Sequence, residues 1–292
     1  MLGAGFLDVL PGSPGTESIR LVTELTLALI LFCDASTVKL RQAESDVGLP
    51  LRLLGIGLPL TVALGAVAAH VLIPSISWAE AGLIGAILAP TDAALGIAVV
   101  TNPAVPDRIR RALNIESGLN DGIATPFVTV LLTVVVAGTA HEHWAREAVS
   151  ELLRGAGIGI AVGLVGGWLV RRAQNAQWST PMSDELFVLS LALVSYGAAV
   201  HYSGNGFVAA FIAGLVFGAA SRGQLEKATE FADTVGLFSS FVVWIIFGAV
   251  FVGPVLRAGV HARPILYAVV SLTVVRMAPV AVSLRCAPAP PA

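Results

Sequence analysis

Long apolar runs alternate with short polar segments along most of the chain. A membrane-spanning helix needs about 20 mostly apolar residues, and nine windows meet that requirement: 21–38, 51–73, 81–100, 112–137, 152–170, 186–202, 204–220, 235–255 and 265–284. Because 186–202 and 204–220 are short and nearly touch, they are consistent with one tight hairpin or with two half-buried pieces. The pattern predicts an all-α, polytopic membrane helical bundle of about nine spans.

The polar segments between these windows are short. Residues 41–50 and 221–234 are polar enough to be surface connectors, and no loop is long enough for a soluble domain. We therefore expect an extracytoplasmic segment at 1–20, one membrane domain at 21–284 and a Pro-rich cytoplasmic tail at 285–292.

Composition supports the same class of protein. Of the 292 residues, 56% are hydrophobic and 12% are charged, against about 25% charged in an ordinary soluble domain. A formal net charge of −2 offers no basic field for nucleic acid. The two cysteines match no zinc or disulfide pattern. We expect a membrane protein that is not an enzyme, carries no cofactor and binds no nucleic acid.

The distribution of Lys and Arg predicts the orientation. Cytoplasmic loops carry an excess of these residues. One side holds Arg20, Arg146, Arg154, Arg257 and Arg263. The other holds Lys39, Arg41, Arg52, Arg108, Arg110, Arg111, Arg171, Arg172, Arg222, Lys227 and Arg285. This places the N-terminus outside and the C-terminus in the cytoplasm, with the chain in the cell inner (plasma) membrane.

Five ionisable residues stand out inside the apolar windows, away from the window ends where a charged side chain can reach water: Asp34, Asp92, Glu116, Asp121 and Arg276. A charged group inside a membrane costs several kcal/mol unless it is paired, so each is by default a functional hypothesis.

Asp92 follows a proline in the middle of its window. Pro90 removes one backbone hydrogen bond and frees a carbonyl of the preceding turn, so we predict a broken helix at this point. Interrupted helices at mid-membrane offer carbonyls to cations in secondary transporters. The alternative is a simple kink in which Asp92 bonds to a neighbouring helix.

The segment 116–122 presents two polar faces if it is helical. Ser117 and Asp121 are four residues apart and share one face, whereas Glu116 and Asn120 share another about 100° away. A packing seam built on the glycines of this segment would explain the glycines but not the two acids.

Counting charges indicates what the acids do. If Glu116 pairs with Arg276, three carboxylates remain without a protein counter-charge, so they must hold protons or bind cations. Oxygen-only ligands suit a hard cation; the candidates are Asp121, Asp92, Ser117, Thr91 and free carbonyls. Competition between proton and cation for one site, coupled to alternating access, produces exchange.

Four segments now carry a resemblance: 31–36, 85–93, 116–122 and 204–215. At these residues the sequence resembles the monovalent cation:proton antiporters, in the branch of sodium/proton exchangers whose site carries an Asn-Asp pair. The resemblance implies an inverted-repeat fold and exchange of Na+, or Li+ or K+, for H+, by a homodimer in the lipid bilayer.

The same resemblance implies roles for particular residues. Asp121, beside Asn120, corresponds to the central carboxylate that binds cation and proton. Thr91 and Asp92 correspond to the unwound crossing of two helices. The serine at Ser117 and an acid near Asp34 complete the coordination.

The resemblance also implies a structural ion pair. Glu116 corresponds to a glutamate held by an arginine of a later helix, for which Arg276 is the candidate. In the family that arginine is usually followed closely by proline, whereas here Met277 and Ala278 come before Pro279.

Family members have about thirteen spans, and the nine windows correspond to the third to the eleventh. We therefore expect a chain shortened at both ends. The alternative functions are an inactive or co-assembling membrane fragment of such an antiporter and, less favoured, a cation channel or an intramembrane aspartyl protease.

Overall fold

The computed structural model describes residues 16–38, 48–91, 102–137, 144–221, 226–259 and 261–285. All regular secondary structure in these ranges is helical. Each of the nine apolar windows is mostly helical over its described part, which confirms the predicted all-α membrane architecture.

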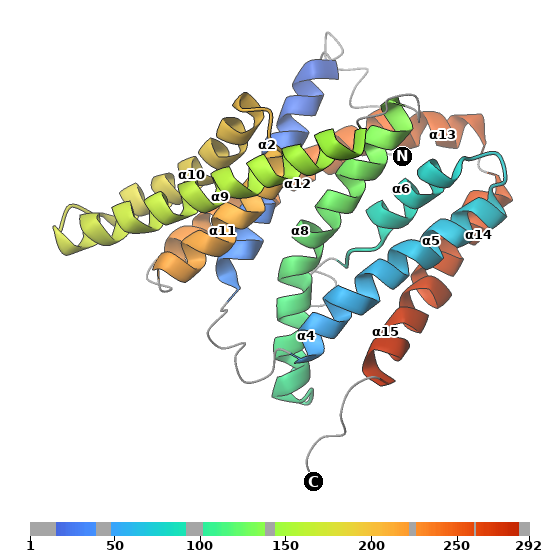
Figure 1. Ribbon diagram of the computed structural model, residues 1–292, viewed down its shortest axis with the longest axis horizontal. Coiled ribbons are helices and arrows are strands. Elements are labelled where there is room, and N and C mark those ends of the chain that lie inside the picture. Colours follow the sequence, from blue (N-terminus) through green and yellow to red (C-terminus); the bar gives the residue numbers. More distant parts are fainter. Residues whose placement is uncertain are drawn as a thin grey trace. The chain divides into compact units, whose positions relative to one another are not determined.

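The helical segments, in chain order, are α2 Thr16–Thr37, α4 Gly48–Arg52, η1 Leu53–Gly57, α5 Leu58–Leu72, α6 Trp78–Leu88, α8 Asp107–Ala137, α9 Trp144–Asn175, α10 Pro181–His201, α11 Gly206–Ser221, α12 Glu226–Phe247, η2 Gly248–Val252, α13 Gly253–Ala258, α14 Ala262–Val270, η3 Ser271–Val275 and α15 Arg276–Arg285. Within the described ranges, six continuous helices are long and apolar enough to cross a membrane, and α6 and α11 are shorter apolar helices. The protein is therefore a multi-pass membrane protein (Figure 1).

The chain divides into two compact units. Unit 1 comprises Met1–Thr37 and Leu153–His261, and unit 2 comprises Val38–Leu152 and Ala262–Ala292. Both units are discontinuous in sequence, so each is held together by contacts between distant parts of the chain.

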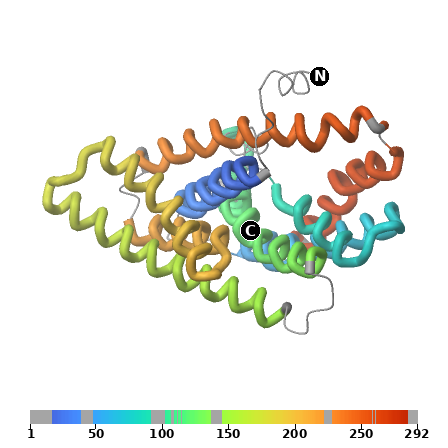
Figure 2. Tube along the Cα trace, turned by 90° about the horizontal axis from the view of Figure 1, so that it is seen from above, coloured from blue at the N-terminus to red at the C-terminus, as the bar shows by residue number. Residues whose placement is uncertain are grey.

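In unit 1, α2 packs against both α11 and α12 (Figure 2). Phe32 on α2 and Phe217 on α11 are almost fully buried, with ring centroids 5.7 Å apart. Ala28 and Ala232 are also fully buried in this core. Small residues let the backbones approach closely, which is how helices associate where lipid removes the hydrophobic driving force.

Helix α9 packs against α11 through glycines spaced four residues apart. A Cβ atom at Gly159 would lie 2.6 Å from the carbonyl oxygen of Ala209, and one at Gly163 would lie 2.7 Å from that of Ala213. Both obstacles are backbone atoms, which cannot move aside as a flexible side chain can. Gly157, on the same helix, has open space where its Cβ would be.

Gly159→Ala should lower the thermal unfolding midpoint of the detergent-solubilised chain, because overpacking costs roughly 1–3 kcal/mol. Gly157→Ala is the matched control. There the higher helix propensity of alanine should leave the midpoint unchanged or raise it. Equal effects of the two substitutions would contradict close α9–α11 packing.

In unit 2, α5 and α6 form a helical hairpin (Figure 1). The hairpin turn ends at Ser77, whose hydroxyl accepts from the backbone N–H of Glu80 in a capping box that starts α6. The two helices cross where a Cβ on Gly85 would lie 2.6 Å from the carbonyl oxygen of Val62. Helix α8 packs on α6, and α14 and α15 pack on α5.

Three helices contain a π-helical stretch, which the sequence analysis did not predict. Each stretch lies shortly before a proline: η1 before Pro59, η2 before Pro254 and η3 before Pro279. Proline has no N–H and clashes with the carbonyl four residues earlier, and a local widening of the helix relieves that conflict. The stretch η3 leads directly into Arg276.

Two segment boundaries differ from expectation. Helix α2 begins at Thr16, inside the predicted extracytoplasmic segment 1–20. Helix α12 begins at Glu226, so it includes most of the predicted connector 221–234. The reason is that Ala228 and Ala232 are buried four residues apart, which continues an apolar stripe among the polar residues.

Candidate functional site

Helix α6 is interrupted at the predicted position. It ends at Leu88, Ala89 is its C-cap, and Pro90 and Thr91 have left the helix. The predicted end of the helix at Pro90 is therefore observed, and whether the helix resumes depends on residues 92–101, outside the described ranges. Asp92 lies outside the described residues.

The interrupted end of α6 is attached to α8 by an asparagine. Asn120 is fully buried, and its Nδ2 donates to both the carbonyl oxygen and Oγ1 of Thr91 at 2.8 Å. The Thr91 hydroxyl in turn donates to the Glu116 carboxylate, with Oγ1–Oε distances of 3.2 and 3.3 Å. Glu116 and Asn120 thus share one face of α8, as their spacing predicts.

Arg276, at the start of α15, contacts the same chain segment. Its Nη2 donates to the carbonyl oxygen of Ala89 at 2.8 Å and to that of Pro90 at 2.6 Å. Carbonyls at the C-terminal end of a helix lack intrahelical partners and carry the negative end of the helix dipole. A guanidinium satisfies both needs, because it supplies several N–H donors and a positive charge.

This geometry corrects the predicted contact between Glu116 and Arg276. In the part of the chain that the structure describes, the two side chains do not form a direct ion pair. They interact electrostatically at longer range and are linked through residues 89–91. The physical reason is that the carbonyls of Ala89 and Pro90, which have no intrahelical partner where α6 ends, take the N–H donors of the guanidinium.

The position of Thr91 also differs from the predicted grouping. Thr91 was grouped with Ser117 and Asp121, but its hydroxyl contacts Glu116 and Asn120 on the neighbouring face of α8. Because it donates once and accepts once, one lone pair of Oγ1 remains available.

Ser117 and Asp121 lie one turn apart on α8 and are both partly buried. The carbonyl oxygen of Asp121 accepts from the Thr125 hydroxyl at 2.7 Å. Asp121 directly follows Asn120, the residue that bonds to Thr91 at the end of α6.

Asp34 belongs to a different unit from the cluster around Thr91. It lies on α2 in unit 1, whereas Thr91, Glu116, Asn120 and Arg276 all belong to unit 2. Among the described residues, no group of three or more His, Cys, Asp or Glu side chains is arranged to hold a metal ion. The remaining oxygen donors are hydroxyls and carbonyls, which suit a transported alkali cation better than a resident transition metal.

Two contacts are not predictable from the sequence pattern: the one between Arg276 and the carbonyls at the end of α6, and the one between Tyr196 and Glu24. The proline at position 90 indicated free carbonyls, but nothing local pointed to Arg276 as their partner. In unit 1, Tyr196 Oη donates to Glu24 at 2.7 Å, and Arg20 pairs with the same carboxylate at 2.6 Å. The Arg20–Glu24 spacing was readable from the sequence, whereas no sequence pattern connects Tyr196 with Glu24.

Comparison with known proteins agrees with this geometry. The model of the family "Sodium/hydrogen exchanger, transmembrane" matches residues 1–289. The K(+)/H(+) antiporter NhaP2 of Shewanella sp. (strain ANA-3) is 30% identical over 198 residues, 68% of this chain and 34% of that protein. The K(+)/H(+) antiporter NhaP of Alkalimonas amylolytica is 28% identical over 242 residues, 78% of this chain and 39% of that protein.

A solved structure shows the same fold. The sodium proton antiporter MjNhaP1 from Methanocaldococcus jannaschii superposes with a TM-score of 0.71 at 20% identity, covering 98% of this chain and 70% of that one. The helical architecture is therefore that of a multi-pass membrane protein with a sodium proton antiporter fold. The chain belongs to the sodium/hydrogen exchanger family, a family of cation/proton antiporters. It spans about a third of the length of the curated relatives it matches.

The contact geometry predicts an order of coupling energies. In a double-mutant cycle on thermal stability, Thr91→Val and Glu116→Gln should couple by about 1 kcal/mol, because a hydrogen bond to a carboxylate is lost in either single variant. Glu116→Gln and Arg276→Gln should couple more weakly. A stronger coupling between Glu116 and Arg276 than between Thr91 and Glu116 would contradict this geometry and support a direct ion pair.

Proposed function

We propose that this chain carries out exchange of a monovalent cation, in the first place Na+, for H+ across the membrane by alternating access. The observation that carries the proposal is the attachment of an interrupted helix to α8 by Asn120, directly beside the carboxylate of Asp121. An interrupted helix exposes backbone carbonyls at membrane depth, and an adjacent acid can hold either a proton or a cation.

Asp121 is the central carboxylate of this mechanism. Ser117, one turn away on α8, supplies a hydroxyl oxygen, and Thr91 supplies its remaining lone pair. Asn120 positions Thr91, because its Nδ2 donates to both the carbonyl oxygen and Oγ1 of Thr91, and its Oδ1 accepts from the backbone N–H of Asp121. Asp92, which follows Thr91 directly in the sequence, is the further proposed ligand.

Glu116 and Arg276 have a supporting role. Arg276 neutralises the negative end of α6, and Glu116 accepts from Thr91, so together they hold the interrupted helix in one conformation. Exchange then requires no further cofactor, because the transported Na+ and H+ are the only ions the chemistry needs.

K+ is the second candidate for the cation. The relatives from Shewanella and Alkalimonas are named K(+)/H(+) antiporters, whereas a relative from Zygosaccharomyces rouxii, 29% identical over 155 residues, 50% of this chain and 19% of that protein, is named Na(+)/H(+) antiporter 2. Carboxylate, hydroxyl and carbonyl oxygens accept either ion. Measuring exchange with Na+, Li+ and K+ in parallel distinguishes them.

The proposed setting is the cell inner (plasma) membrane, with the N-terminus outside and the C-terminus in the cytoplasm. The excess of Lys and Arg on one side supports this orientation. We further propose that the protein works as a homodimer in the lipid bilayer and contributes to pH homeostasis.

Asp121→Asn should abolish exchange, because the amide cannot hold the proton that is exchanged. The assay follows a pH-sensitive dye in proteoliposomes that carry a pH gradient, after addition of each cation. Glu147→Gln, which removes an exposed acid at the start of α9, is the matched control and should exchange at the wild-type rate. Exchange by Asp121→Asn at that rate would refute the site.

Apparent cation affinity should fall as the pH is lowered. The reason is that a proton and a cation compete for the same carboxylate oxygens, so each bound cation must displace a proton at low pH. Cation titrations of exchange at several pH values should give an affinity that rises with pH and then levels off. A pH-independent affinity would mean that the two ions use separate sites.

A further inference from the structure

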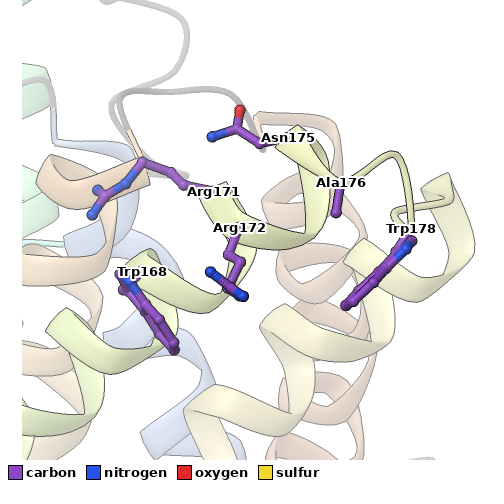
Figure 3. Close-up of a pocket in the computed structure, with 6 residues that line it drawn as sticks. All are labelled: Trp168, Arg171, Arg172, Asn175, Ala176 and Trp178. Carbon is purple, nitrogen blue, oxygen red and sulfur yellow. The ribbon is translucent and has the colours of Figure 1, made fainter.

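An open pocket of about 510 Å³ lies at the end of α9, in unit 1. It is lined by Trp168, Arg171, Arg172, Asn175, Ala176 and Trp178 (Figure 3). All of these residues belong to unit 1. Two tryptophans and two arginines around one hollow are unusual in a chain with only 12% charged residues.

The lining is positively charged and contains no acid. The Arg172 guanidinium lies 5.8 Å from the centre of the Trp168 ring, a cation–π contact that orients the charge without using its N–H donors. Arg171 donates from Nη1 to the carbonyl oxygen of Ala220, which anchors the end of α9 to α11. The N–H donors of Arg172, which the cation–π contact leaves unused, and the exposed amide of Asn175 are therefore accessible to a ligand.

The pocket lies at the boundary of two spanning helices. Residues 145–175 and 181–201 are both long and apolar enough to cross a membrane, and the pocket includes the turn between them. Trp168 is 52% exposed and Trp178 is 77% exposed. Exposed tryptophans at helix ends mark the headgroup level of a bilayer, where an indole has an apolar body and a polar N–H.

We propose that this pocket binds a phosphate-bearing anion in the form of the headgroup of an anionic phospholipid. Arg172 contacts the phosphate in bidentate fashion, Asn175 donates to it, and the two indoles pack on the glycerol and upper acyl chains. The charge of the lining selects an anionic headgroup over a zwitterionic one, because the latter brings its own cation into a positive site. The lipid chains follow the exposed apolar surface of α9.

The test is a lipid titration of the full chain in detergent, followed by native mass spectrometry. Phosphatidylglycerol should bind at least about tenfold more tightly than phosphatidylcholine, and Arg172→Gln should weaken phosphatidylglycerol binding about tenfold by removing a charge-assisted bidentate contact. Arg172→Lys should give an intermediate loss, since a point charge replaces a planar fork.

Arg257→Gln is the matched control, because it removes an exposed arginine of the same unit that does not line the pocket. It should leave phosphatidylglycerol binding unchanged. Trp178→Leu, at a highly exposed position, provides a second variant if Arg172→Gln does not insert, and it should also weaken binding.

Three results would overturn the proposal. Equal binding of the two lipids would exclude headgroup charge selection. Equal binding by Arg172→Gln and Arg257→Gln would show that binding is diffuse. Displacement of phosphatidylglycerol by inorganic phosphate at comparable concentration would identify a site for a soluble anion. None of these readouts depends on exchange activity.

Discussion

A helix that is interrupted inside a membrane leaves backbone groups without partners, and no lipid can satisfy them. At the end of α6, Arg276 donates hydrogen bonds to the carbonyl oxygens of Ala89 and Pro90, and Asn120 donates one to the carbonyl oxygen of Thr91. The rest of unit 2 follows from this requirement. Helices α8 and α15 must both reach the same short segment, and each brings a polar side chain to it.

Both units bring helices close together at glycines, and unit 2 adds a cluster of polar contacts. Unit 1 is held by small residues, with α11 in backbone-level contact with α9 and α2 through glycines. Unit 2 contains the hydrogen-bonded polar cluster around Thr91 and two of the π-helical stretches.

Much of this organisation could be predicted because it depends on local patterns. Apolar windows of spanning length identify the helices whatever their partners are. Pro90 ends α6 because the missing N–H and the ring clash act within one turn. The four-residue spacing of Glu116 and Asn120 placed them on one face of α8, which their shared contact with Thr91 confirms. The segment boundaries at 1–20 and 221–234 were less accurate, since burial by α2 rather than local polarity extends α12.

What the sequence by itself determined is therefore the set of helices, the point of interruption and the faces of α8, each set by neighbours a few residues away. Only the tertiary structure decided the partners. Arg276 contacts a carbonyl 187 residues earlier, and Tyr196 contacts a glutamate 172 residues earlier. In both cases several chemically equivalent acceptors were available along the chain. The choice among them depends on where packing places each helix, and no local spacing records that.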